Sequence, residues 1–233
     1  DYGDNFSWKV ASRYTINDMY TVRASVGTGF RAPTPGQIST KNVSTRIDSN
    51  GEPVAEGIFP AAHPVSAYFG ALPLDAETSQ SATIGISATP SDNLTVTLDL
   101  YQISLDDRIV LSSDKQLSDA DYAALLASGF DAKDIAQVSF YTNDLTTETT
   151  GIDLVATYNM DWAGGNTVLS AAANWNSLEI SNRVNRGTSA APVYFVGAES
   201  VHDNEHGAPE YRMNLTARHT MNNEMVVTLR GNM

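Results

Sequence analysis

The chain has 233 residues, of which 14 are Lys or Arg and 27 are Asp or Glu, so its formal net charge at pH 7 is -13. A charge this negative repels phosphate backbones, and we therefore expect no nucleic-acid partner. The absence of Cys excludes disulfide bonds, a thiolate nucleophile and Cys-ligated zinc. No segment approaches the roughly 18 consecutive apolar residues of a transmembrane helix, which excludes a helical membrane protein.

Alternation of apolar and polar residues is the strongest pattern along the chain. From Phe6 to Ile16 the even positions are mostly apolar and the odd positions polar, and the pattern resumes after the turn at Asn17-Asp18. A period of two predicts β-strands, and a short polar turn between two strands predicts a hairpin. The same pattern predicts four hairpins, at about residues 6–29, 77–106, 146–177 and 209–231.

Three long connections, at about residues 30–76, 106–145 and 178–209, join these hairpins. Long loops at one end of the strands and tight turns at the other are typical of an outer-membrane β-barrel. A soluble sandwich would also explain the apolar stripes, but aromatic residues at both ends of the stripes, with aliphatic residues between them, favour contact with lipid. The sequence predicts one all-β domain over residues 1–233. It would hold about eight antiparallel up-and-down strands of a larger transmembrane barrel, with extracellular long loops and periplasmic short turns.

Charged residues occupy strand positions whose parity is opposite to that of the apolar stripe. Such residues would be costly beneath a packed sheet, whereas a wet or plugged barrel lumen accommodates them. We therefore predict that seven of them face the lumen: Arg13, Arg23, Asp99, Asp153, Arg212, Arg218 and Arg230.

A family resemblance rests on four segments. Residues 23–33 (RASVGTGFRAP) resemble the strand-to-loop segment of TonB-dependent outer-membrane receptors. Similar matches are found at residues 74–79 (LDAETS), in 94–110 with its ending DRI, and from 141–143 (YTN) to 150–154 (TGIDL). The resemblance covers nearly the whole chain in the family's usual order. Neither a plug domain nor a TonB box is recognised, so we expect the chain to be an internal portion of the barrel.

The resemblance implies a receptor that imports a scarce bulky nutrient, most often a ferric siderophore or a similar iron complex, across the bacterial outer membrane. It also implies outer-membrane lipid, a plug domain of the same parent chain, the TonB system and a small-molecule ligand as partners. Plug carboxylates would then pair with some of the lumen arginines. The alternatives are a passive porin or autotransporter barrel and a secreted all-β binding module, for example one that binds carbohydrate. We expect neither an enzyme nor a cofactor, since no nucleophile, base and orienting group fall in one plausible site.

The ligand is expected on the long-loop side, because the tight turns are too small to build a concave site. Arginines are favoured there because most siderophore complexes are anionic, and polar and aromatic residues near the strand ends would complete the site. The candidate binding residues are Arg31, Gln37, Tyr68, Tyr141, Asn143, Arg183 and Arg186.

Two short motifs lie in the long connections. Ser118, followed by two acidic residues and then Tyr122 and Leu125, predicts one or two turns of an N-capped helix. Residues 202–206 (HDNEH) fit the H-x-x-E-H zinc-protease pattern, which requires both His on one face of a helix. Gly, Ala and Pro follow directly at 207–209 and nothing upstream predicts a helix, so we interpret the segment as a polar outer loop without a metal site.

Overall fold

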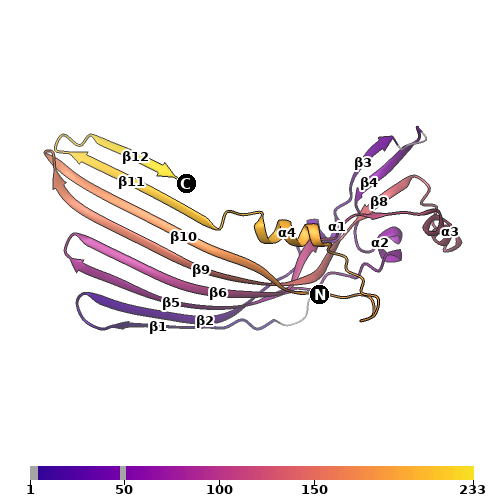
Figure 1. Cartoon of the computed structure of the whole chain (residues 1–233), viewed down its shortest axis with the longest axis horizontal. Helices are drawn as coiled ribbons and strands as arrows, with labels where there is room; N and C mark the ends of the chain where they lie inside the picture. The colour runs from indigo at the N-terminus through magenta and orange to yellow at the C-terminus, as the bar shows by residue number, and fades with distance from the viewer. Residues whose placement is uncertain (1–4, 48–50) are drawn as a thin grey trace.

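The computed structural model describes residues 5–47 and 51–233. Its largest element is an eight-stranded antiparallel sheet (Figure 1). The strands are β1 (Lys9–Thr15), β2 (Tyr20–Arg31), β5 (Glu77–Ser91), β6 (Leu94–Leu111), β9 (Tyr141–Trp162), β10 (Gly165–Arg183), β11 (Tyr211–Met221) and β12 (Val226–Asn232). They pair in the order β1-β2-β5-β6-β9-β10-β11-β12, so each strand lies beside the strand that precedes it in this sheet along the chain. The predicted fold class, eight up-and-down strands of an unclosed barrel, is confirmed.

The three long connections fold together at one end of this sheet (Figure 1). They hold a second sheet of order β3-β4-β8-β7, made of β3 (Asn42–Ile47), β4 (Pro53–Ile58), β8 (Ile135–Ser139) and β7 (Lys115–Gln116). They also hold the helices α1 (Pro35–Ser39), α2 (Pro64–Tyr68), α3 (Asp119–Ala127) and α4 (Ala198–His206). We call residues 32–76, 112–140 and 184–210 the loop cap. No helix in the described ranges is long and apolar enough to cross a bilayer.

The strand register places the apolar positions of the large sheet on one face. One row of paired residues crosses seven strands: Tyr14, Val22, Ile86, Leu98, Leu154, Ala173 and Met213. Tyr14 is 70% exposed and Leu154 is 43% exposed, so nothing in the described chain covers this face. The row follows from the period of two in the sequence, because paired residues of antiparallel strands project to the same side.

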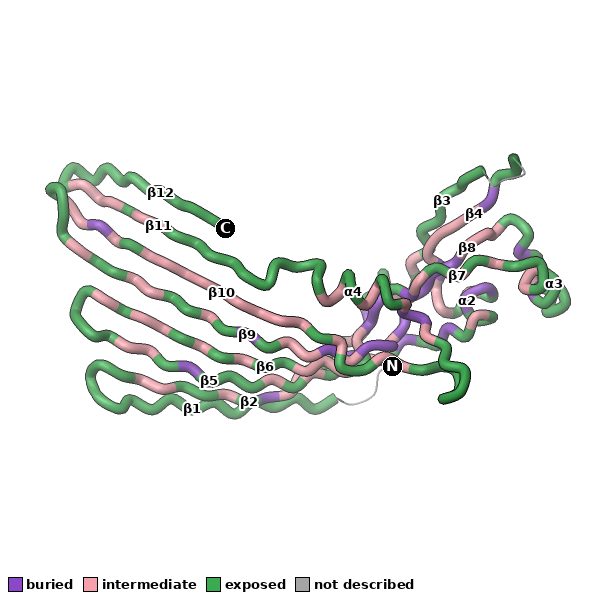
Figure 2. The backbone as a smooth tube through the Cα atoms, in the orientation of Figure 1, coloured by how far each residue is buried: buried purple, intermediate pink, exposed green. Residues whose placement is uncertain are grey.

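Burial is concentrated in the loop cap, as Figure 2 shows. One cluster, which we call the cap core, takes residues from all three connections: Phe59, Val65, Ala71, Leu125, Ala132, Val138, Phe140 and Phe195. A smaller junction cluster, Val110, Leu145 and Val196 with Ile180 and Val201 against it, joins the cap to the strands. The connections therefore share one apolar core and fold as a unit.

The sequence made predictions for two segments that are helical in the structure. The helix expected after Ser118 is confirmed as α3, whose N-cap Ser118 and Asp121 form a capping box. The interpretation of residues 202–206 as an outer loop is wrong, because they form the second half of α4. That helix has little apolar periodicity of its own, and Val201 fixes it by packing on the junction cluster.

Candidate functional site

The seven charged positions of the strands share the face opposite the apolar row. A second row of paired residues contains five of them together with two uncharged neighbours: Arg13, Arg23, Gly85, Asp99, Asp153, Asn174 and Arg212. Arg218 pairs with Val168 and Arg230 pairs with Thr216, and the alternation along β11 places both on the same face as Arg212. We retain as a proposal that this face lines the lumen of the complete barrel.

Arg23 and Asp99 form an ion pair across the intervening strand β5. The Nε atom of Arg23 donates to Asp99 Oδ1 at 2.8 Å. Gly85 of β5 is paired with Arg23 of β2 on one side and with Asp99 of β6 on the other. A Cβ at Gly85 would lie 2.0 Å from Asp99 Oδ1 and 3.0 Å from Arg23 Nε. Glycine therefore leaves the space through which the two side chains meet.

Replacing Gly85 with alanine is expected to displace the Asp99 carboxylate and break this ion pair. The cost is at most about 1 kcal/mol, since both partners are partly exposed. Gly231→Ala is the matched control, because a Cβ there meets no atom within 4 Å. The free energy of unfolding in detergent is measured for each glycine variant alone and combined with Arg23→Gln. The effect of Gly85→Ala should depend on whether Arg23 is present, whereas the effect of Gly231→Ala should not. Equal effects of the two glycine variants would contradict this role.

Arg31 and Asn143, two of the predicted ligand residues, fasten the strand ends instead of projecting freely. Arg31 Nε lies 2.5 Å from Oε2 of Glu77, a buried side chain whose Oε1 accepts from the amide of Ile109 at 2.7 Å. Asn143 donates to the carbonyls of Asp75 and Asp107 at 3.0 and 2.7 Å. These bonds tie β2, β5, β6 and β9 together where they enter the cap.

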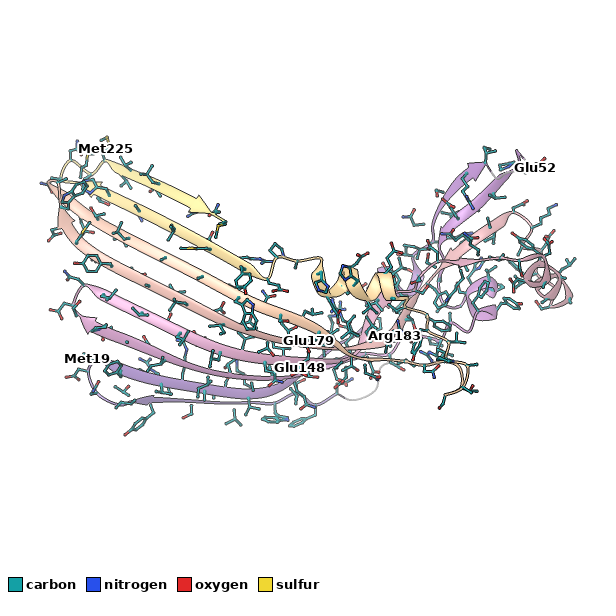
Figure 3. The ribbon with its side chains drawn as sticks, viewed as in Figure 1. Met19, Glu52, Glu148, Glu179, Arg183 and Met225 are labelled. Carbon is teal, nitrogen blue, oxygen red and sulfur yellow. The ribbon has the colours of Figure 1, made fainter. Side chains whose placement is uncertain are left out.

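Arg183 and Arg186 hold the third connection against the sheet. The Arg186 guanidinium lies 2.5 Å from Oδ1 of Asp144, a carboxylate with 0% exposure. Arg183 lies 3.7 Å from the centre of the Tyr194 ring and donates to the Val196 carbonyl at 3.2 Å. Figure 3 shows Arg183 where the strands meet the cap.

Gln37 and Tyr68 belong to the first connection. Gln37 completes the capping box of α1 and lines a groove of about 630 Å³ between α1, α2 and residues 71–76. The Tyr68 hydroxyl donates to Asp121 Oδ1 at 2.8 Å and so links α2 to α3. This hydrogen bond raises the pKa of Tyr68, while the Ser118 hydroxyl and amide lower the pKa of Asp121.

Tyr141 lines a second groove, of about 400 Å³, between the end of β6 and α4. Arg108 lies in the same groove, and none of the ion pairs in the described ranges includes it. Arg108 is not among the binding residues predicted from the sequence. It follows a β-bulge after Leu105, and Asp107 within that bulge has a φ of 53°. The bulge shifts the pairing, so parity along β6 could not predict where Arg108 points.

The deeply buried acids Glu77 and Asp144 were also absent from the sequence predictions. Each organises a strand end by accepting from an arginine in another segment: Arg31 for Glu77 and Arg186 for Asp144. Asp144 also accepts from the Thr142 hydroxyl at 2.7 Å. An acidic residue at the edge of a polar connection gives no sequence signal of burial, because its partner lies at least 42 residues away along the chain.

A family model described as "TonB dependent receptor-like, beta-barrel" matches residues 1–228. No curated protein matches the chain. Among solved structures, the RagAB peptide transporter is 15% identical with a TM-score of 0.52, and 91% of this chain covers 27% of it.

Two iron-related receptors are also similar. A variant of the ferric enterobactin receptor PfeA from Pseudomonas aeruginosa is 13% identical with a TM-score of 0.54, and 99% of this chain covers 27% of it. The siderophore receptor PirA from Acinetobacter baumannii is 14% identical with a TM-score of 0.51, and 96% of this chain covers 28% of it. The chain thus spans little more than a quarter of each solved structure, and identities this low establish a shared fold.

Proposed function

The chain belongs to the TonB-dependent receptor-like β-barrel family, and from that premise we propose that it is part of an outer-membrane receptor for active uptake of a ferric siderophore or similar iron complex. The match over residues 1–228 is the observation that carries this proposal. Outer-membrane lipid, a plug domain elsewhere in the parent protein and the TonB system are the proposed partners. The match favours this function over a passive barrel or a secreted carbohydrate-binding module.

The two faces of the large sheet support this placement. The exposed apolar row is suited to lipid, and the row of charged residues is suited to a polar lumen. Met19 and Met225 mark the end with tight turns, whereas Glu148 and Glu179 lie near the cap (Figure 3). Glu148 and Glu179 are paired residues of β9 and β10, and they lie on the same face of the sheet as Ile152. The apolar band on this face therefore ends before the strands reach the cap.

For the ligand we propose the groove of Arg108 and Tyr141. Arg31, Arg183 and Arg186 already contact Glu77, Val196 and Asp144, respectively. Arg108 forms no such ion pair in the described chain, although its charge acts on Glu77 and Asp203 also lines the groove. Its guanidinium would receive an anionic chelate in the groove that Tyr141 also lines. A cation in a partly desolvated groove both attracts and orients an anion.

The full-length receptor should bind ferric catecholate or ferric hydroxamate complexes, and Arg108→Gln and Tyr141→Ala should each weaken that binding. Loss of one charge-assisted hydrogen bond costs about 1.5–3 kcal/mol, which corresponds to about tenfold or more in affinity. Arg46→Gln is the matched control, because Arg46 pairs with Glu56 on the β3-β4 hairpin. Fluorescence titration of the purified receptor gives the affinities.

Growth on the same complexes as sole iron source tests the mode of uptake. Growth should require both the receptor and a working TonB system, whereas a passive barrel would support growth without TonB. Absence of binding to any ferric complex would overturn the ligand class. Wild-type affinity in both groove variants would move the site elsewhere in the parent protein.

A further inference from the structure

Helix α4 carries two histidines one turn apart. The rings of His202 and His206 are stacked, with centroids 4.3 Å apart and an interplanar angle of 27°. Both side chains are exposed, as are Glu199 and Asp203 on the same side of the helix. Side chains at positions i and i+4 are neighbours on a helix surface, so the two imidazoles lie side by side on an exposed part of the helix.

The opposite side of α4 fixes the helix to the protein. Val201 packs on the junction cluster, and the hydroxyls of Ser200 and Ser113 lie 3.1 Å apart. Glu205 turns inward, where its Oε1 accepts from the amide of Ile180 at 2.8 Å. The glutamate of the H-x-x-E-H pattern is therefore engaged in holding β10, and the outward face presents its histidines without it.

One hydrogen bond prepares His206 for coordination. Its Nδ1 lies 3.1 Å from the carbonyl oxygen of His202. A carbonyl oxygen only accepts, so Nδ1 carries the hydrogen, and in the neutral ring the lone pair is on Nε2. Histidines that bind metals commonly donate their second ring N–H to a carbonyl in this way, which fixes both the tautomer and the ring orientation.

We propose that His202 and His206 together bind one divalent transition-metal ion of the Cu²⁺, Ni²⁺ and Zn²⁺ group through their Nε2 atoms. Imidazole suits these metals, whereas Mg²⁺ and Ca²⁺ prefer oxygen ligands. No group of three or more potential ligands is assembled in the described ranges. The site is therefore a two-point chelate whose remaining positions are taken by water. It uses other residues of the helix that walls the groove proposed above for the iron complex, and it replaces the expectation that this segment holds no metal.

The test uses the full-length receptor in detergent, freed of metal by a chelator and titrated calorimetrically with Cu²⁺ and with Zn²⁺ at neutral pH. His202→Gln and His206→Gln should each weaken one binding site by about tenfold or more, since even the loss of an outer-shell partner costs about 10–100-fold. His219→Gln is the control, because His219 Nδ1 lies 2.8 Å from the Thr167 hydroxyl on the sheet. It should bind as the unaltered receptor does, and excess Mg²⁺ should not compete.

Hydrogen exchange provides a second readout that does not depend on other metal sites in the parent protein. Zn²⁺ should slow exchange of the α4 amides in the unaltered receptor and in His219→Gln, because a chelate across one turn stabilises the helix. The same ion should leave α4 unchanged in His202→Gln and His206→Gln. Equal metal affinity and equal α4 protection in all four proteins would overturn the site.

Discussion

Leu125→Ala is expected to open the loop cap, whereas Leu126→Ala, one position further along α3, should leave it closed. Leu125 is 1% exposed and belongs to the cap core, and Leu126 is 63% exposed. Removing a buried leucine side chain costs about 2–5 kcal/mol, since transfer free energy is lost and a cavity remains. The same change at the surface stays within about 0.5 kcal/mol. The two variants share residue type and helix, so burial alone distinguishes them.

Hydrogen exchange of the full-length receptor measures this opening. Faster exchange should extend from α3 to β8 and to the residues that directly follow β4 and β8, because Phe59, Val138 and Phe140 contribute to the same core as Leu125. The strands of the large sheet should keep their protection. Faster exchange confined to α3 would contradict the view that the three connections fold as one unit.

Arg186→Gln is expected to release residues 184–210 from the sheet. The Asp144 carboxylate is fully buried, and its Oδ2 atom has no hydrogen-bond partner among the described residues. Loss of Arg186 would leave the Thr142 hydroxyl as the remaining side-chain donor to this charge. Breaking a buried ion pair on one side costs about 3–5 kcal/mol. Arg46→Gln should cost no more than about 1 kcal/mol, since both partners of the Arg46–Glu56 pair are partly exposed.

Limited proteolysis of the folded receptor within residues 184–210 measures this release. Arg186→Gln should be cleaved faster, and Asp144→Asn combined with Arg186→Gln should recover part of the resistance, because the double variant buries no uncompensated charge. This comparison separates a structural role of Arg186 from the ligand contact predicted from the sequence. Unchanged proteolysis in Arg186→Gln would return Arg186 to the candidate ligand residues.

The sequence by itself determined the large sheet. Strand positions and their two faces follow from a period of two, which needs only neighbouring residues. Tight turns then fix the pairing of each hairpin. At the first turn, for example, Asn17 Oδ1 accepts from the amides of Met19 and Tyr20 at 2.9 Å. For this reason Arg13 and Arg23 could be assigned to one face, and their direct pairing agrees with that assignment.

Only the tertiary structure decided the loop cap and its grooves. The cap depends on pairing between distant segments, such as the parallel contact of β4 with β8, and polar connections carry no periodic signal for such contacts. The helical state of His202 and His206 depends on the packing of Val201, and the bulge before Arg108 alters which way that residue points. Arg31, Arg183 and Arg186 were predicted to bind a ligand, but they contact Glu77, Val196 and Asp144, respectively. Long-range folding brings these partners to them.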